Sequence, residues 1–437
     1  MNAAPQSIRH RWIIVASLFA LFAVNFADKA VIGLAAEPIM RELGLSHSAF
    51  GRIAGSFFVL FSVMGLIVGV ISDHLKTRWL LLGMAVIWAV SQAPLLIMAT
   101  PATLVASRIL LGAAEGPTYP VAIHALYKWF PDHKRALPTS LMTMGGAVGT
   151  GMVAPGVTWI IVTYGWRSAF VAVAIVSLMW AALWLVVGKE GPLDAGGHAH
   201  GKVSPALAEV LPERVPMWRL IFSRTSLGSF LSAFSAYVLL TIATIWLPSY
   251  LVRAAGYTMT QVGLIVVVPA FVQMLSMPLL GWWSQRLQVR GVSSRVARGV
   301  LGAAMVVASG AALVMIPLLH AGPLLVVMVT IAFSLSPFAF PSGVMMISEI
   351  SPSKQRGGML GVNNFVFTLA GLITPMVIGH IIDMSSSQVA GYRIGIIVAG
   401  GFAVLGGLIS ALLVHPAADR ARFAARASRG ALVSASD

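Results

Sequence analysis

The chain contains no cysteine among its 437 residues, and charged residues make up only 10% of it. The lack of cysteine excludes disulfides, zinc–thiolate sites and thiol nucleophiles. The scarcity of charge comes with 58% hydrophobic residues and a mean hydropathy of +0.88. This balance excludes an ordinary soluble globular protein and indicates an integral membrane protein in a lipid bilayer.

Acidic residues are also few, 14 against 29 lysines and arginines, which leaves a formal net charge of +15. A charge of this size could indicate nucleic acid as a partner. The basic residues, however, lie between apolar runs rather than along one face, so we interpret them as loop residues that orient membrane helices. We therefore expect no nucleic-acid partner.

Twelve apolar segments are long enough to span a bilayer, which takes about 20 residues. The first six lie at 12–36, 50–72, 79–98, 102–127, 138–163 and 168–187. The second six lie at 226–250, 259–283, 299–320, 323–348, 358–383 and 391–414. We predict an all-α integral membrane protein with six-helix halves at 1–187 and 225–415. A mostly polar linker at 188–224 joins the halves, and we expect the tail at 416–437 to be frayed or surface-bound.

The orientation of the spans follows from the distribution of basic residues between the two sides. One side carries most of them, beginning with Arg9 and Arg11 before the first span, and this bias places both termini and the linker in the cytoplasm. The first apolar run is long and contains Asp28 and Lys29, so we interpret it as a retained helix rather than a cleaved signal.

The two halves resemble each other in sequence. Pro120, Pro131 and Arg135 recur as Pro341, Pro352 and Arg356, all at an offset of 221 residues. Parallel six-helix repeats are the architecture of transporters that rock around a site near the middle of the membrane. The repeat therefore predicts two pseudo-symmetric halves with the site between them.

The segment 108–135 carries charges at membrane depth. Seven residues separate Arg108 from Glu115, which places them two turns apart on nearly the same helix face. A charge at this depth costs a few kcal/mol unless it faces a polar cavity or a partner. The pair therefore indicates a substrate or ion pathway. A structural ion pair inside the helix bundle is the alternative.

A second group of polar residues lies in the first span. Asn25, Asp28 and Lys29 are spaced three and four residues apart, so they share a helix face. Together with Arg108 and Glu115 they give two acids and two bases in one half. A substrate carboxylate that competes for a base would free an acid to take a proton. The alternative is a neutralised Asp28–Lys29 pair near the outer mouth.

The loop after the second span carries Gly69, Asp73 and Arg78. The segment 69–78 resembles the G-x-x-x-D-(R/K)-x-G-(R/K)-(R/K) loop of the major facilitator superfamily, with His74 and Lys76 in place of the usual arginine and glycine. The resemblance implies the major facilitator fold and a conformational latch at Gly69, Asp73 and Arg78. An ordinary charged turn is the alternative.

Within that superfamily the chain resembles the anion:cation symporters, which import organic anions with a cation. Three stretches carry the resemblance: 25–29, 108–135 and 361–375. The chain departs from the family pattern at Lys29, where the family has arginine, and at Phe61 and Gly65, where sugar-acid members carry tyrosine and glutamine. The Gly-Asn pair of the eleventh helix is replaced by Phe367-Thr368. Each change reduces the number of hydrogen bonds that side chains can offer in the expected cavity. We therefore infer a substrate with fewer hydroxyls than a sugar acid.

These observations predict a proton-coupled symporter of a small organic anion, a monomer in the inner membrane. The expected anion ligands are Lys29, Arg108, Asn364, Asn25 and Phe61. The expected proton sites are Asp28 and Glu115. We expect no cofactor, no metal site and no enzymatic activity, because no metal-binding cluster, nucleophile motif or phosphate loop is found. A drug/proton antiporter and a membrane sensor that binds ligand without carrying it are the alternatives.

Overall fold

The computed structural model describes residues 5–71, 75–130, 135–192, 214–352 and 355–434, which form helices joined by short loops. The first half contains α1 (Pro5–Leu34), α2 (Ala36–Leu43), α3 (His47–Ile71), α4 (Thr77–Gln92), α5 (Pro94–Ile97), α6 (Pro101–Glu115), α7 (Thr118–Tyr127), α8 (Ala136–Ala147), the π-helical η2 (Val148–Met152), α9 (Ala154–Tyr164) and α10 (Trp166–Val187).

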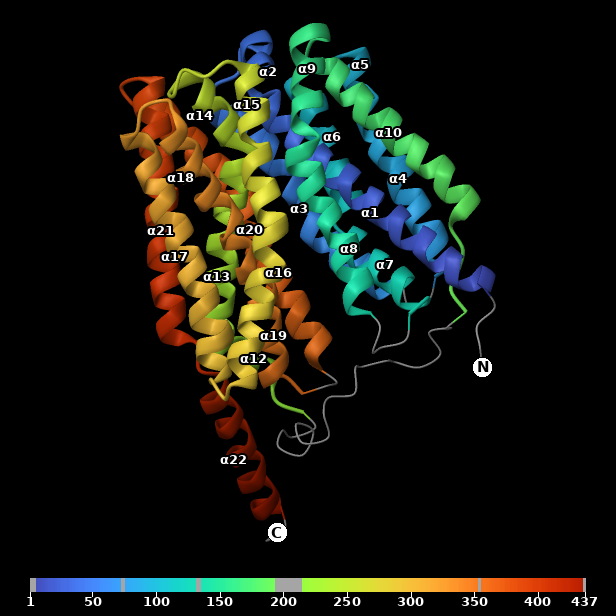
Figure 1. Ribbon diagram of the computed structural model, residues 1–437, viewed down its shortest axis with the longest axis vertical. Helices are drawn as coiled ribbons and strands as arrows, with labels where there is room; N and C mark the ends of the chain where they lie inside the picture. Colours follow the sequence, from blue (N-terminus) through green and yellow to red (C-terminus); the bar gives the residue numbers. More distant parts are fainter. Residues whose placement is uncertain (1–4, 72–74, 131–134, 193–213, 353–354, 435–437) are drawn as a thin grey trace.

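The second half begins with a short helix and ends with one beyond the last span. It contains α12 (Met217–Ile221), α13 (Arg224–Thr241), the π-helical η3 (Ile242–Trp246), α14 (Leu247–Arg253), α15 (Met259–Ile265), α16 (Val267–Val289), the π-helical η4 (Arg295–Val300), α17 (Leu301–Met315), α18 (Pro323–Ser334), α19 (Ala339–Ile350), α20 (Arg356–Met384), α21 (Gln388–Leu413) and α22 (Pro416–Ser434). Figure 1 shows the halves side by side, with both termini at the same end.

Eleven helices or joined helices in the described part of the chain are long and apolar enough to cross a membrane. The remaining predicted span, 102–127, is broken into α6 and α7 around Gly116 and Pro117. Proline lacks the N–H that a continuous helix needs and clashes with the preceding turn, which explains the break. The all-helical membrane fold with two halves is therefore confirmed.

The tail after His415 forms the helix α22, whose first turn is fixed to the second half. Whether the rest of the tail is frayed or surface-bound stays a prediction. The Asp419 carboxylate accepts hydrogen bonds from the backbone N–H and the hydroxyl of Thr225, at 2.8 and 2.7 Å, and so caps the start of α13. Phe423 packs into a small apolar cluster with Val215 and Ile350.

The segment just after α10 holds the end of the first half together. Glu190 accepts hydrogen bonds from the Arg78 backbone N–H at 2.9 Å and from the Thr77 hydroxyl, and it pairs with Lys128 at 2.5 Å. Burial alone would raise the pKa of Glu190, but the hydrogen bonds from Lys128, Arg78 and Thr77 outweigh burial and hold the pKa below its ordinary value. The carboxylate therefore stays charged and ties α4 to α7.

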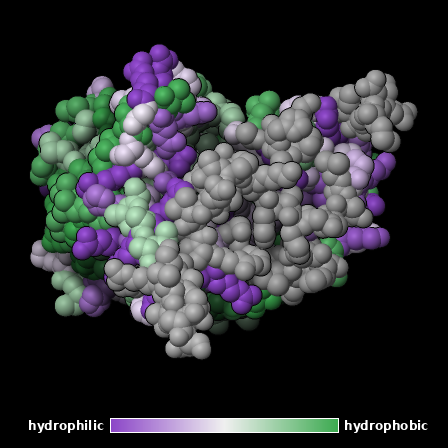
Figure 2. Space-filling view, turned by 90° about the horizontal axis from the view of Figure 1, so that it is seen from below, coloured by the Kyte–Doolittle hydropathy of each residue, from purple (hydrophilic) through white to green (hydrophobic). Residues whose placement is uncertain are grey.

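The contacts between the halves gather at the end away from the termini and near the middle of the bundle. Away from the termini, Arg253 of α14 pairs with Glu37 of α2, and Tyr392 of α21 donates to the same carboxylate. Near the middle, α3 packs along α20. The opposite face, which carries the termini, exposes many hydrophilic residues, as Figure 2 shows.

Candidate functional site

The ion pair at the centre of the first half joins Lys29 to Glu115. The Lys29 Nζ lies 3.1 Å from a Glu115 carboxylate oxygen and donates a 2.6 Å hydrogen bond to the Asn25 side-chain oxygen, one helical turn earlier in α1. The Lys29 side chain is 15% exposed, whereas that of Glu115 is fully buried. Lysine has three N–H donors, so one remains after these two contacts. Lys29 is therefore the charged group of this pair that a ligand can reach.

Phenylalanine rings surround the Lys29 ammonium. Its Nζ lies 4.5 Å from the ring centroid of Phe26, 5.1 Å from that of Phe61 and 5.8 Å from that of Phe57. A cation above aromatic faces is stabilised by the ring quadrupole. The rings also keep water from most of the ammonium, so a ligand anion would meet this charge in an apolar setting where its attraction is stronger than in water.

Gly112 of α6 and Gly116, directly after α6, bring these rings to the ion pair. A Cβ at Gly112 would lie 1.8 Å from the Phe57 carbonyl oxygen, and one at Gly116 would lie 1.9 Å from the Phe61 carbonyl oxygen. Only glycine permits so close an approach of two helices. Helices α3 and α6 are therefore in backbone contact at the level of Glu115, which places Phe57 and Phe61 over Lys29.

A second polar chain runs behind the first. Arg108 donates to the side-chain oxygen of Gln92 at 3.2 Å, and the Gln92 amide donates to Asp28 at 2.8 Å. The Arg108 guanidinium also lies 5.3 Å from the centroid of the Phe170 ring in α10. All three polar side chains are buried, and Arg108 is only 1% exposed. Gln92 thus bridges Arg108 and Asp28. The sequence analysis had instead considered pairs of Arg108 with Glu115 and of Asp28 with Lys29.

The six anion and proton residues that the sequence placed in the first half fall into these two chains. Asn25, Lys29, Phe61 and Glu115 form the front chain, and Asp28 and Arg108 belong to the rear one. The ion pair that forms joins Glu115 to Lys29, so Arg108 and Glu115 do not make the structural pair considered above. Arg108 faces α4 and α10 inside the first half, behind the groups that a ligand would meet.

The remaining predicted site residues lie further away. Asn364 is partly exposed in α20, and its backbone oxygen accepts from Thr368, which in turn hydrogen-bonds to Ser62 of α3 across the halves. Arg78 lies in the first turn of α4 and donates to the backbone oxygen of Leu185 at 2.7 Å. Gly69 lies in the last turn of α3, and Asp73 lies outside the described residues. The predicted latch therefore stays a prediction.

Sequence reasoning missed two residues of the site. Gln92 is a single amide near the end of an apolar span, and a side chain of this type at membrane depth needs a partner, so it could have been found. Tyr237 of α13 brings the second half to the site: its ring lies 5.7 Å from Phe58 and 5.4 Å from Phe367. No sequence signal distinguishes Tyr237 from packing aromatics, because its partners are on other helices.

Three oxygens of the two buried acids have no hydrogen-bond partner among the described residues. These are Oδ2 of Asp28 and both carboxylate oxygens of Glu115, of which Oε2 has the ion-pair contact with Lys29. A buried carboxylate oxygen without a donor is costly, and a proton on that oxygen removes most of the charge that makes it so. The site can therefore hold one anion on a reachable base and a proton on either of two buried acids.

A double-mutant cycle will separate the two roles open to Arg108. If Arg108 supports Asp28 through Gln92, we expect Arg108→Lys and Gln92→Leu to weaken anion binding to a similar extent. We also expect the double variant to be no worse than either, because residues in one network are not additive. Binding of a labelled anion by purified protein, with the melting temperature as a fold control, measures this. Additive losses, with the larger one at Arg108, would mean that Arg108 contacts the anion itself.

Comparison with known proteins identifies the family. The model of the Major Facilitator Superfamily matches residues 18–342. The chain belongs to the Major Facilitator Superfamily. Among solved structures, a bacterial homologue of the human lysosomal transporter Spinster superposes with a TM-score of 0.72 at 18% identity, over 96% of this chain and 99% of that one. The resemblance inferred from the loop at 69–78 is thereby confirmed, and so is the fold.

Curated relatives of this superfamily member cover nearly its whole length. A protein named as a probable sulfoacetate transporter, from Cupriavidus necator, is 26% identical over 94% of this chain and 95% of the relative. A hexuronate transporter of Bacillus subtilis is 28% identical over 92% and 94%. A D-galactonate transporter of Escherichia coli is 24% identical over 95% and 97%. These relatives are transporters rather than enzymes, as the sequence analysis expected.

Proposed function

We propose that this protein imports a small organic anion together with protons, by alternating access, across the inner membrane. The observation that carries the proposal is the Lys29–Glu115 pair, in which a partly exposed base is held by a fully buried acid. The named substrates of the relatives, sulfoacetate, hexuronate and galactonate, are all organic anions, which supports an anion as the cargo.

Coupling follows from competition for one base. A substrate carboxylate that binds the Lys29 ammonium takes the place of Glu115 as its counter-ion. The Glu115 carboxylate then lies buried without its partner and is stabilised by taking a proton, since desolvation disfavours the charged form. Release of the anion restores the ion pair and expels the proton. Asp28, held by Gln92, is the second acid through which a proton can pass.

The direction of opening follows from the contacts between the halves. They are concentrated at the end away from the termini, where Glu37 and Asp383 bind the opposite half. With both termini in the cytoplasm, as the basic loops predict, that end is the external one. Lys29 is then reached from the cytoplasmic side in this conformation, and rocking of the halves would expose it to the outside.

The substrate is proposed to be a carboxylate with few hydroxyls. Lys29 binds its charge, Asn25 and Asn364 offer polar contacts, and Phe61 covers its body. Arg108 acts on this site through Gln92 and Asp28. Sulfoacetate, the named substrate of one relative, also lacks hydroxyls. Phenylalanine rings around the ammonium leave few groups that could satisfy the hydroxyls of a sugar acid, and an unsatisfied polar group is costly to bury.

Proton coupling can be tested in proteoliposomes. A counterflow screen of labelled carboxylates, with sulfoacetate, a hexuronate and galactonate included, first identifies a transported anion. An imposed inward proton gradient should then accelerate its uptake several-fold, and a protonophore should abolish accumulation, because each bound anion frees one acid to carry a proton. Accumulation that depends on a sodium gradient alone would contradict proton symport while leaving anion transport in place.

A further inference from the structure

A continuous path of aromatic rings leads from Lys29 into the second half. Phe61, above the ammonium, lies 5.7 Å from Phe58, whose ring contacts Tyr237 of α13 at 5.7 Å edge to face. Tyr237 in turn lies 5.4 Å from Phe367 and 6.1 Å from Phe340. The path therefore crosses from α3 to α13, α19 and α20, and it starts at the charge that a substrate anion would seek.

Partial exposure distinguishes these rings from aromatic side chains of the core. Phe26, Phe58, Phe61, Phe340 and Phe367 are all half-buried, although they lie at membrane depth between the halves. Core rings such as Phe50 and Phe170 are fully buried. Because these rings keep free surface on the inner faces of both halves, a ligand can contact them.

Tyr237 links the aromatic rings of the two halves. It is 9% exposed, and its ring lies 5.7 Å from Phe58 of the first half and 5.4 Å from Phe367 of the second. A ligand whose charge is on Lys29 and whose body reaches Tyr237 would therefore contact both halves at once. Such a ligand would respond to the relative position of the halves, as a transported substrate must.

We propose that the site takes an aryl carboxylate, with the carboxylate on Lys29 and its flat ring between Phe61 and Tyr237. The inference rests on the proposed function and deepens it. A planar aromatic ring can pack against these rings by offset stacking or edge to face, which a saturated ring of similar size cannot do. A hydroxyl-rich body would instead bury polar groups against phenylalanine. Phe61 and Tyr237 are then the residues that determine specificity.

Benzoate and cyclohexanecarboxylate are suitable probes, because they share the charge and nearly share the size but differ in aromaticity. Binding to the purified full-length protein, measured by displacement of labelled benzoate, should favour benzoate by about 2- to 10-fold, the range found for an aromatic pair. Phe61→Leu and Tyr237→Leu should each abolish most of this preference. Tyr237→Phe keeps the ring and should retain it.

Control variants separate the assignment of an aryl substrate from the proposed anion transport. Phe402→Leu alters a ring of α21 that pairs with Phe234, outside the aromatic path, and should leave the preference unchanged. Lys29→Gln should abolish binding of both acids, and melting temperatures report folding for every variant. Equal binding of benzoate and cyclohexanecarboxylate to the unaltered protein would overturn the aryl assignment but not anion transport. If neither these nor any carboxylate of the counterflow screen binds, the proposed function itself fails.

Discussion

Replacing Glu115 with glutamine should leave anion counterflow intact and abolish accumulation driven by a proton gradient. Glutamine resembles the protonated acid, and its oxygen can still accept from the Lys29 ammonium, which lies 3.1 Å from the carboxylate in the native protein. Anion affinity should be unchanged or higher, because no charged carboxylate competes for Lys29. Counterflow needs only exchange of loaded carriers, whereas accumulation needs the proton to leave. Both are measured in the same proteoliposomes.

Two further variants complete this experiment. Lys29→Gln leaves Glu115 as a buried acid without its base, which costs roughly 3–5 kcal/mol if the acid stays charged. We expect a lower melting temperature and loss of both counterflow and accumulation. Glu349→Gln removes the acid of the Arg298–Glu349 pair in the second half, outside the site, and should change neither transport mode.

The outcome of Glu115→Gln distinguishes three roles. Loss of both modes with a normal melting temperature would place Glu115 among the groups that bind the anion. Loss of both with a lowered melting temperature would make it structural. If both persist, Asp28 alone carries the proton, and the competition for Lys29 is not the coupling step.

The number and order of the spans could be predicted from sequence because a bilayer imposes one requirement on every crossing segment, about 20 apolar residues. The break between α6 and α7 was also signalled locally, by the Gly116-Pro117 dipeptide. The π-helical segments, such as η2 at Val148–Met152, were not predicted. π-Helical turns are rare and occur mostly as single turns inside α-helices, so the length and composition of an apolar segment do not reveal them.

The sequence could predict which site residues share a face of one helix, but not which residues of different helices contact each other. Helical spacing placed Asn25 and Lys29 on one face, and the structure joins them by a hydrogen bond. Spacing also placed Arg108 with Glu115, but position on one helix does not specify which neighbouring helix supplies the partner. In the structure, Arg108 donates a hydrogen bond to Gln92, and Glu115 forms an ion pair with Lys29. Contacts between helices are set by packing, which a single sequence does not reveal.

Removing the carboxylate of Asp383 should shift the protein toward the conformation that is open at the end away from the termini. Asp383, at the end of α20, accepts hydrogen bonds from the backbone N–H groups of His47 and Ser48, at 3.0 and 2.7 Å, and its oxygen lies 3.1 Å from the His47 ring nitrogen. The acid therefore caps α3 of the first half from the second half. The N-terminal end of a helix favours an anion in this position.

The size of the shift follows from the bonds that are lost. A hydrogen bond to a charged group contributes about 1.5–3 kcal/mol, and 1.4 kcal/mol is a factor of ten in an equilibrium constant. Asp383→Ala should therefore change the ratio of the two conformations roughly tenfold or more. Asp383→Asn keeps one acceptor oxygen and should have a smaller effect. The Arg253–Glu37 pair remains in both variants and limits the change.

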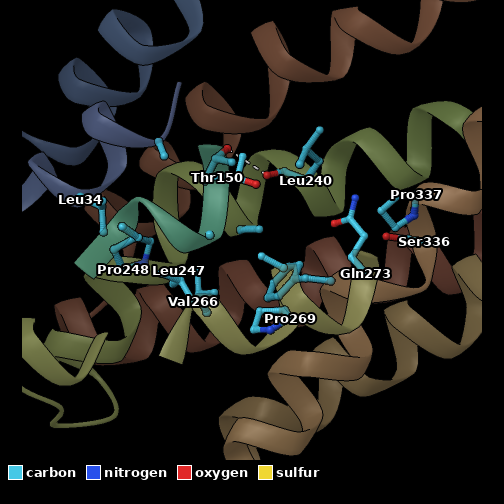
Figure 3. Close-up of a pocket in the computed structure, with 17 residues that line it drawn as sticks. Leu34, Thr150, Leu240, Leu247, Pro248, Val266, Pro269, Gln273, Ser336 and Pro337 are labelled. Carbon is cyan, nitrogen blue, oxygen red and sulfur yellow. Dashed lines mark hydrogen bonds between the residues drawn. The ribbon is translucent and has the colours of Figure 1, made fainter. Parts of the chain in front are cut away.

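Thiol labelling can measure this shift directly, because the chain has no cysteine of its own. A cavity of about 70 Å³ lies between the halves, with Leu34 and Leu247 in its wall, as Figure 3 shows, and Ala30 also lines it. In Ala30→Cys, a membrane-impermeant reagent added to intact cells should react slowly, and Asp383→Ala should accelerate the reaction about tenfold.

Glu42 offers the matched control for Asp383. It is an acid of α2 that binds Arg167 and Trp166 within the first half, and hydrogen bonds from these two side chains hold its pKa below the ordinary value. Glu42→Ala removes a charged hydrogen-bond acceptor without touching a contact between the halves, so labelling should stay slow. Equal acceleration in Glu42→Ala and Asp383→Ala would show general loosening rather than opening. An unchanged rate in Asp383→Ala would mean that the Arg253–Glu37 pair and helix packing close this end by themselves.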